Sequence, residues 1–417
     1  MFWRETKIFD ERNDWFSFHH NMEKRRRPRR FLSSCLLFLL LQAFSNTSTA
    51  LNLNNPKTMF QSSSKAVSVR VVSYNVLSSH LAQPSHFATY PPAHLDASSR
   101  LTAVFNKLEH EMKQEANTVL CLQEVSYDWA GSLHTFFASR GYHCVAGQYG
   151  KKFNGYMGVV LAWPVETLEA VHVDISRLAD QREGGWPARN EPSALERLWN
   201  SVNALVDSSR KFAGLPVEEV IDHWNMSERR FNVLVTAVLR EKESGRQFCI
   251  GNYHMPCAYY APMVMTIHAD LAARHVQKLA QEHGVVPHVL AGDFNIKPSE
   301  SIYKLLTTGT MDRDDPFYPT PKNDMEWTPT AAAMQSAYAL SEHGEPNFTN
   351  YARVKEQEPF IDTLDYIFLS QKHWKVRDVK AIPHRDEYSQ LPNLDREEPS
   401  DHVLIAASLA LELAQTD

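Results

Sequence analysis

The sequence predicts an α/β fold within one large catalytic domain. Apolar, strand-like runs alternate with segments whose apolar residues recur at helical spacing. Short acid, amide and histidine motifs follow the ends of these runs from residue 75 to residue 402. At 417 residues with 43% hydrophobic composition, the chain can bury a large core in one domain or two. The spread of the motifs favours one domain.

The first elements form a strand, a helix and a second strand. Apolar residues predict strands over Val67–Leu77 and Thr118–Val125. Between them, Leu101–Met112 has the spacing of a helix. Asn75 and Glu124 stand near the two strand ends, where loops expose polar groups above a buried sheet.

The remaining elements deliver the other motifs. A helix is predicted from Val264 to Leu279. Further strands are predicted over Tyr156–Trp163, Phe231–Leu239, Phe248–Met255, His288–Ala291, Thr363–Ser370 and Val403–Leu411. The segment 174–230 contains Gly184–Gly185 and interrupts this order, so we interpret it as an insertion, either a surface elaboration or a lid.

The N-terminus has the composition of a targeting segment. Basic residues KRRRPRR at 24–30 precede the apolar run Phe31–Phe44 and small residues up to Ala50. This order is typical of a secretory signal or a signal anchor, with translation from Met1 or Met22. An organelle-targeting leader and a buried core helix are the alternatives. Residues 51–66 then form a linker, and residues 67–413 the catalytic domain.

Charge is distributed unevenly along the chain. The formal net charge is −6, yet the first thirty residues hold nine basic and five acidic side chains, which leaves 34 basic and 44 acidic residues in the remainder. Affinity for long nucleic acids comes mainly from Lys and Arg side chains that neutralise phosphates. The acidic remainder therefore favours a short nucleic-acid end or a small substrate, although a local basic groove is compatible with an acidic total.

Oxygen ligands point to a hard divalent metal. Glu124 offers a carboxylate and Asn75 a neutral carbonyl oxygen, a pair suited to magnesium, with manganese as an alternative ion. In the GDFN motif, Asp293 can orient or deprotonate a water, and Asn295 can donate its amide to a phosphate oxygen. A structural Asp-Phe-Asn turn is the competing explanation of that motif.

Histidines provide candidate acid–base groups. His402 follows Asp401 in the SDH motif, and imidazole titrates near neutral pH. Asp365 can fix the tautomer of His402, and His254 can bond a non-bridging phosphate oxygen. Lys151 and Lys152 are candidates for substrate-phosphate contacts, with solvated loop lysines as the alternative. The cysteines are predicted to be reduced core thiols rather than zinc ligands.

The order of the motifs SYNV, QE, NYH, GDFN, LDYIF and SDH resembles the endonuclease/exonuclease/phosphatase superfamily, which has the DNase I-like fold. Further stretches, including YNVLSSHLAQ, LCLQEV and GEPNFTNYA, resemble the branch of carbon-catabolite-repressor-type deadenylases, nocturnin, Angel proteins and 2',5'-phosphodiesterases. One departure is MPCAYYAP after His254, where these relatives usually continue with Leu and an aromatic residue.

The resemblance implies a four-layered α/β sandwich, with two central, mostly antiparallel sheets flanked by helices. It also implies magnesium bound through Glu124 with help from Asn75 and Asp401, and His402 paired with Asp365. The leading expectation is a phosphodiesterase that hydrolyses the 3' end of RNA. A nucleotide phosphomonoesterase and a lipid or inositol phosphate hydrolase are the alternatives. The membrane is a candidate partner through the N-terminal segment, and no protein partner is identifiable.

Overall fold

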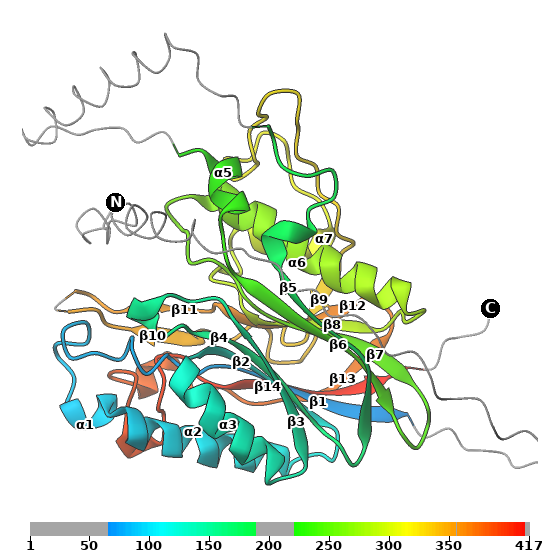
Figure 1. The fold of residues 1–417 in the computed structure, drawn as a ribbon. Coiled ribbons are helices and arrows are strands. Elements are labelled where there is room, and N and C mark those ends of the chain that lie inside the picture. Colours follow the sequence, from blue (N-terminus) through cyan, green and yellow to red (C-terminus); the bar gives the residue numbers. More distant parts are fainter. Residues whose placement is uncertain (1–65, 189–220, 356, 413–417) are drawn as a thin grey trace, which may run out of the picture. The chain divides into compact units, whose positions relative to one another are not determined.

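The structure is a computed structural model that describes residues 66–188, 221–355 and 357–412 (Figure 1). The predicted targeting segment at 1–50 and most of the linker lie outside these residues, as does the middle of the predicted insertion, 189–220. Within the described residues, no helix is both long enough and apolar enough to cross a membrane.

Two six-stranded sheets form the centre of the domain. The first has the order β13-β14-β1-β2-β4-β3, and β1 and β2 are its parallel pair. Its strands are β1 (Val67–Asn75), β2 (Thr118–Val125), β3 (Tyr142–Gln148), β4 (Gly158–Pro164), β13 (Trp374–Val379) and β14 (Ile405–Leu411).

The second sheet repeats this arrangement, with the order β5-β6-β7-β8-β12-β9 and one parallel pair, β7 and β8. Its strands are β5 (Leu168–Arg177), β6 (Val233–Glu241), β7 (Gln247–His254), β8 (His288–Asp293), β9 (Met334–Ser336) and β12 (Asp365–Ser370). A separate two-stranded ribbon pairs β10 (Asn350–Ala352) with β11 (Phe360–Asp362).

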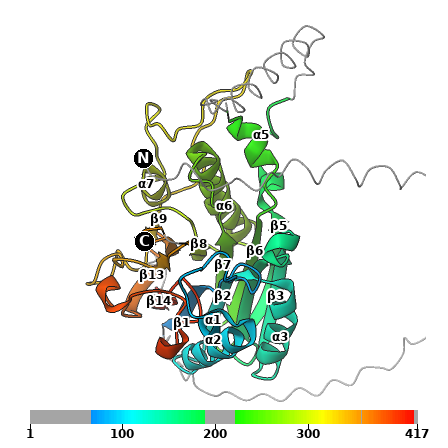
Figure 2. The same ribbon diagram turned by 90° about the vertical axis from the view of Figure 1, so that its left-hand side faces the viewer.

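Helices cover both outer faces of the paired sheets. The first sheet is covered by α2 and α3, and the second by α5, α6 and α7 (Figures 1 and 2). The helices are α1 (Pro92–Leu95), α2 (Ala97–Met112), α3 (Tyr127–Ala138), α5 (His223–Glu228), α6 (Pro262–Glu282) and α7 (Ser301–Thr308). This four-layered α/β sandwich, with mostly antiparallel sheets, confirms the predicted fold class.

Alternation along β1 explains the layering. Val69 and Val71 face the core between the two sheets, whereas Val72 and Tyr74 face the core under α2 and α3. Because successive strand residues point to opposite faces, a strand covered on both sides needs apolar residues at nearly every position. The continuous apolar runs in the sequence are therefore those of central strands.

Each predicted strand overlaps an observed strand, with ends that differ by up to two residues for most of them, and the structure adds several other elements. Among these, α3, β3, β5 and β13 were not predicted, because their burial patterns alternate or their apolar runs are short. The predicted insertion at 174–230 begins inside β5, because residues 174–177 complete that strand. Residues 174–177 belong to the strand because they pair with β6. The charged side chains in this part of the sequence gave no strand-like pattern.

Candidate active site

The motif residues meet at one edge of the two sheets. Asn75 ends β1, His254 ends β7 and Asp293 ends β8. In each parallel pair the carboxyl ends of the strands lie at the same edge, and β7 and β8 place His254 opposite Asp293. Asp365 begins β12 directly opposite Asp293 in the antiparallel register. Residues far apart in sequence are thereby brought together.

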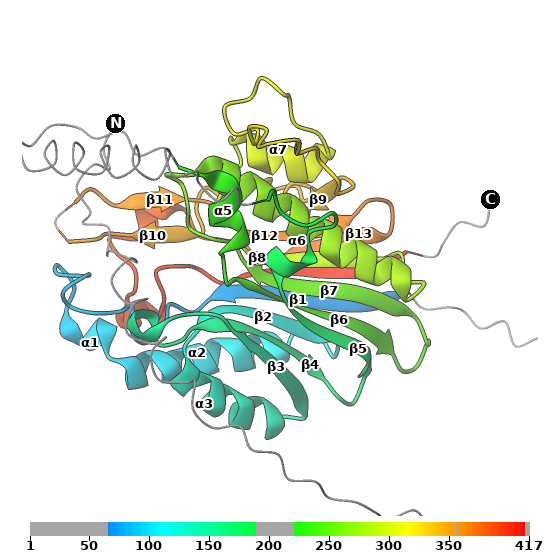
Figure 3. The same ribbon diagram turned by 45° about the horizontal axis from the view of Figure 1, so that its top comes forward.

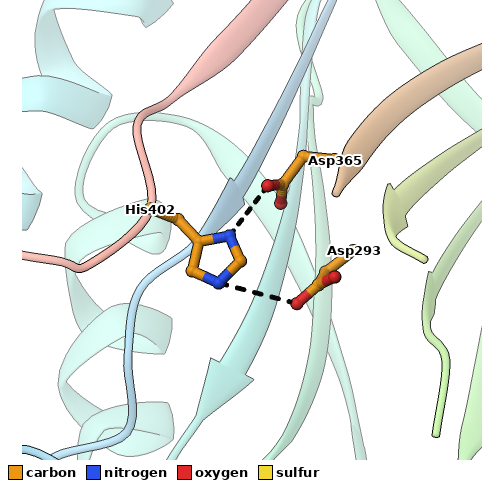
Figure 4. A group of neighbouring side chains, drawn as sticks. All are labelled: Asp293, Asp365 and His402. Atoms are coloured by element: carbon orange, nitrogen blue, oxygen red, sulfur yellow. Dashed lines mark hydrogen bonds and ion pairs between the residues drawn. The ribbon is translucent and has the colours of Figure 1, made fainter. Parts of the chain in front are cut away.

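His402 lies between two carboxylates (Figure 4). Its Nδ1 is 2.7 Å from Asp365 Oδ2, and its Nε2 is 3.8 Å from Asp293 Oδ2. All three side chains are buried. Burial alone would lower the pKa of His402, but the charges of Asp365 and then Asp293 raise it well above its ordinary value. The two carboxylates therefore favour the protonated form of the imidazole in the protein without a metal.

Thr349 fixes the orientation of Asp365. Its hydroxyl donates to Asp365 Oδ2 at 2.6 Å and accepts the backbone N–H groups of Leu364 and Asp365 at 2.9 and 3.0 Å. The same carboxylate oxygen thus receives hydrogen bonds from Thr349 and His402. Such support holds an acid–base pair in a single geometry.

His254 approaches Asp293 from the neighbouring strand. Its Nε2 is 3.5 Å from Asp293 Oδ2, and its Nδ1 is 2.6 Å from the hydroxyl of Tyr149. Burial, and next the charge of Glu124, raise the pKa of Tyr149 well above its ordinary value, so the hydroxyl keeps its proton and can donate to Nδ1. This tautomer directs the N–H at Nε2 toward Asp293.

Asn75 connects the two carboxylates beside it. Its Nδ2 donates to Glu124 Oε1 at 3.1 Å and to Asp293 Oδ2 at 3.0 Å, and its Oδ1 accepts from Leu77 N at 3.0 Å. A backbone N–H can only donate, so the oxygen must face Leu77 and the NH2 must face the carboxylates. Asn75 is thus placed to orient the two acids.

Local backbone distortions aim the side chains at the site. The pairing of β2 with β4 shifts register between Leu122 and Val125, and Glu124 within this irregularity has φ +57°. Asn295 also has positive φ, +53°. Such left-handed conformations are unfavourable for most side chains and concentrate at functional sites. The bulge turns Glu124 away from the regular alternation of β2 and toward Asn75.

Asp401 directly precedes His402 and interacts electrostatically with Glu124. Burial raises the pKa of Asp401 to about 6, and His402 opposes this shift while Glu124 adds to it. Arg100, fully buried in α2, donates to Pro399 O at 2.6 Å, Val76 O at 2.7 Å and Leu77 O at 2.5 Å. It therefore fastens the loop that carries Asp401 to the loop after β1.

Two groups of residues could hold a metal. One ligand atom from each of Asp293, Asp365 and His402 lies within 4.8 Å of the others, but the hydrogen bond between Asp365 and His402 already satisfies part of this group. Glu124 and Asp401 form the second group. Their neighbouring negative charges favour protonation of Asp401, which a bound cation would relieve. Carboxylate oxygens suit a hard divalent ion, so this second group fits one.

The other predicted residues occupy different positions. Asn295 lies at the site and donates to Met255 O at 3.0 Å, while its backbone N–H donates to Asp293 Oδ1 at 2.9 Å. Lys151 and Lys152 lie at the start of the 3-10 turn Lys152–Asn154, and both are exposed. Ser78 links that turn to the site, because its backbone N–H donates to Glu124 Oε2 at 3.2 Å and its Oγ donates to Asn154 O at 2.9 Å.

Two partners of the site were absent from the sequence analysis. Tyr149 precedes the lysines that were singled out, and Thr349 lies inside the FTNYA stretch used only as a resemblance. The family resemblance of that stretch was the one sequence feature that pointed to Thr349. No sequence feature pointed to Tyr149. The prediction of core thiols is wrong for Cys257, which is exposed, while Cys121 and Cys249 are buried as expected.

Asn252 and Gln123 connect the two sheets through buried side-chain hydrogen bonds. Gln123 Nε2 donates to Asn252 Oδ1 at 2.8 Å, and Asn252 Nδ2 donates to Leu122 O at 3.0 Å and Val160 O at 2.8 Å. These fully buried bonds join the first sheet to the second. Buried amides that satisfy one another in this way fix the relative positions of the two sheets.

The comparisons identify the family. The family model of the endonuclease/exonuclease/phosphatase family matches residues 72–402, which is most of the chain and includes every motif above. The chain belongs to this family. This membership indicates a phosphoric ester hydrolase, and carbon-catabolite-repressor and nocturnin proteins are among the relatives that match the chain.

Relatives with described activities are distant. Human 2',5'-phosphodiesterase 12 is 26% identical over 196 residues, covering 43% of this chain and 29% of that protein. The CCR4-Not complex 3'-5'-exoribonuclease subunit Ccr4 of Neosartorya fischeri is 21% identical over 387 residues, covering 85% of this chain and 49% of that protein. The chain thus spans about a third to a half of these relatives.

A solved structure of similar fold is that of ANGEL2, described as a 2',3'-cyclic phosphatase, in complex with adenosine-2',3'-vanadate. It matches with a TM-score of 0.61 at 19% identity, covering 84% of this chain and 97% of that chain. At this identity the likeness establishes the fold alone. The likeness thereby confirms the predicted sandwich, whereas the family rests on the match of the family model, and the substrate is a separate question.

Proposed function

We propose that the protein is a magnesium-dependent 3' exoribonuclease. The observation that carries the proposal is the buried cluster in which His402, Asp365 and Asp293 adjoin the carboxylates of Glu124 and Asp401. It combines an acid–base pair with oxygen ligands for a cation, and hydrolysis of a phosphodiester needs both.

Glu124 and Asp401 would hold the ion, and Asn75 would orient Glu124 from behind. A bound magnesium ion would neutralise charge on the phosphate and on the departing oxygen. The sequence predicted that the side-chain oxygen of Asn75 would bind the metal. In the structure its NH2 group, rather than its oxygen, faces the carboxylates. Its direct ligation of the metal stays a prediction from sequence.

The chain's own acids and bases account for the proton transfers. Asp293 accepts hydrogen bonds from Asn75 and lies beside two imidazoles, so it is placed to orient and deprotonate the attacking water. His402, protonated and held by Asp365, is placed to donate to a phosphate oxygen through Nε2. His254 and Asn295 would hold non-bridging oxygens.

RNA is preferred as substrate because of the Ccr4 relative, whose name describes a 3'-5' exoribonuclease and whose match covers 85% of this chain. Exposed aromatic residues that lie close in sequence to site residues or to their hydrogen-bond partners support a nucleotide substrate over a lipid, because their faces can stack on bases: Tyr127, Phe153, Tyr156, Phe231, Tyr259 and Tyr260. A nucleotide phosphomonoesterase is the second candidate, favoured by the acidic domain.

The test compares three substrates with the purified full-length chain and magnesium. These are a 3'-adenylated RNA, a small nucleotide monophosphate ester and an inositol phosphate. Stepwise shortening of the RNA supports the proposal. Phosphate release from the small ester alone would establish the phosphatase instead, and turnover of the inositol phosphate alone would contradict both.

We further propose that residues 1–50 direct the chain into the secretory pathway or anchor it in a membrane. The basic run and the apolar segment that follows it support this proposal. Expression from Met1 and from Met22, followed by N-terminal sequencing, tests it. An uncleaved, freely soluble product from both starts would contradict it.

A further inference from the structure

The edge of the second sheet that carries Asp293 and His254 continues across two more strands. β7 pairs with β6, and Asn232, directly before β6, donates through Nδ2 to His254 O at 2.8 Å. β6 in turn pairs with β5, where Val233 lies opposite Arg177. Figure 3 shows β5, β6 and β7 side by side. Three strand spacings separate Asp293 from Arg177, roughly 14 Å. The same edge thus extends well beyond the reacting phosphate.

Aromatic and basic side chains alternate along this extension. Phe231 is 52% exposed, and the guanidinium of Arg177 lies 5.2 Å from its ring centre. Arg230 Nη2 donates to the hydroxyl of Tyr260 at 3.3 Å, and Tyr260 is 54% exposed. One face of the Phe231 ring is therefore covered by a cation, and much of the rest of the side chain is open to solvent.

The guanidinium of Arg230 is incompletely hydrogen-bonded within the described residues. Its Nε is inaccessible to solvent and has no hydrogen-bond partner among the described residues. Arg229, next to it, is exposed. Arg177, by contrast, is engaged with Asp180 at 2.6 Å and with backbone carbonyls, so it packs against Phe231 as a fixed platform.

A cavity of about 470 Å³ lies at the far end of this row. Its lining includes Arg177, Arg182, Arg229, Trp186 and Phe231, together with the acids Asp180 and Glu228. The guanidinium of Arg182 lies 5.4 Å from the ring centre of Trp186. Stacking faces and cations therefore continue from the catalytic edge into a concave surface.

We propose that this row, Tyr260–Arg230–Phe231–Arg177, binds the single-stranded nucleotides of the substrate that lie beyond the one carrying the scissile phosphate. The inference rests on the proposed function and adds a length requirement to it. Bases stack on Tyr260 and Phe231 whatever their sequence, and Arg229 and Arg230 attract the phosphates between them. The row is continuous with the catalytic edge through Asn232 and His254.

The chemistry favours single-stranded nucleic acid over a protein partner. Aromatic rings and Arg side chains also suit protein interfaces, but this row leads from the catalytic edge through Asn232 and His254, where the rest of a longer nucleic-acid substrate can lie. The acidic total of the domain does not oppose this choice, because the contact is local and a local field decides short-range binding. A substrate of one nucleotide would leave the row unused.

Binding can be measured apart from hydrolysis in the full-length His402→Ala protein. Fluorescence anisotropy compares a labelled dinucleotide with a twelve-nucleotide oligoadenylate. We expect Phe231→Ala or Tyr260→Ala to weaken binding of the longer RNA by roughly tenfold, with a smaller loss for the dinucleotide. Arg230→Gln should reduce the slope of log affinity against log salt by about 0.7. Leu340→Ala and Arg313→Gln are matched exposed controls.

The outcomes separate this inference from the proposed function. RNA hydrolysis by the wild-type protein with equal binding losses for both lengths, or none beyond those of the controls, would overturn the inference and leave the function standing. Length-dependent binding that the three variants weaken, in a protein that does not cleave RNA, would uphold the inference and reject the function. Thermal melting of each variant confirms that it is folded.

Discussion

His402 Nδ1 lies 2.7 Å from Asp365 Oδ2, and both side chains are buried at the edge where the two sheets present their polar ends. The pair joins the loop before β14 to the start of β12. Because Thr349 holds the same carboxylate oxygen, rotation of Asp365 would break two hydrogen bonds. The geometry of the acid–base pair is thus set before a substrate arrives.

Replacing either member of this pair should abolish most activity. We expect His402→Ala to lower kcat by about 10²–10⁴-fold, because a positioned proton donor contributes that much. Asp365→Asn should lower it substantially as well, and the double variant should be hardly worse than His402→Ala alone, since the two act as a unit. Steady-state kinetics of the three variants test this, and additive losses would show that the residues act separately.

The same pair should make stability depend on pH. The pKa of His402 in the folded protein lies above the value near 6.5 expected for the unfolded chain. Its interaction with Asp365 therefore contributes its full stabilisation of the folded state below pH about 6.5. That contribution is lost as pH rises through the folded pKa. The difference in unfolding free energy between the wild type and Asp365→Asn should therefore shrink above pH about 6.5. Urea titrations of metal-free protein test it, and a difference that grows with pH would refute it.

Metal affinity should depend on Glu124 directly and on Asn75 indirectly. Asn75→Ala removes the amide that orients Glu124 and should weaken magnesium binding about 10–100-fold, the usual effect of losing a partner behind a ligand. Glu124→Gln should weaken it more. Calorimetric titration of magnesium measures both effects without turnover. Unchanged magnesium affinity in both variants would contradict this assignment and would favour Asp293, Asp365 and His402 as the metal ligands.

Gly292 should tolerate no side chain. Its φ is +152°, and a Cβ added there would lie 1.8 Å from Tyr253 O on the adjacent strand. Gly292→Ala should therefore push β8 away from β7 and separate Asp293 from His254, with lower stability and activity. Thermal melting and kinetics check this, with Gly131→Ala as the control, since nothing lies within 4 Å of an added Cβ there.

Arg100 should hold the site loops in place. Arg100→Met would leave three backbone carbonyls without their donor, at a cost of roughly 1–3 kcal/mol for each one that finds no other. We expect a loss of stability together with weaker magnesium binding, because the loop that carries Asp401 is released. Arg100→Lys should recover part of both. A loss of stability with unchanged magnesium affinity would show that Arg100 stabilises the fold without positioning the metal ligands.

The sequence predicted the central strands because they are buried on both faces and read as apolar runs, as in Thr118–Val125, which the structure reproduces without change. β5 escaped prediction because its burial alternates and its partner β6 follows only after a long intervening segment of the chain. Local patterns reveal a doubly covered strand, whereas an edge strand is recognised only through its neighbour.

For the site, residue types were predictable and their orientations were not. Glu124 and Asp293 are recognisable as acids after strands, but the bulge that turns Glu124 arises from pairing with β4. The NH2 of Asn75 faces the acids because Leu77 N–H occupies its oxygen. Tyr149 reaches His254 across 105 residues. Each of these depends on contacts between distant segments, which no local pattern records.

The activity proposed for this cluster is hydrolysis of the 3' end of RNA with a divalent metal. The most direct measurement follows a 3'-adenylated RNA with magnesium and full-length protein, comparing the wild type, His402→Ala and the surface control Leu340→Ala. We predict stepwise shortening by the wild type and the control, and almost none by His402→Ala. Shortening that survives His402→Ala, or no shortening by any of the three, would contradict the account.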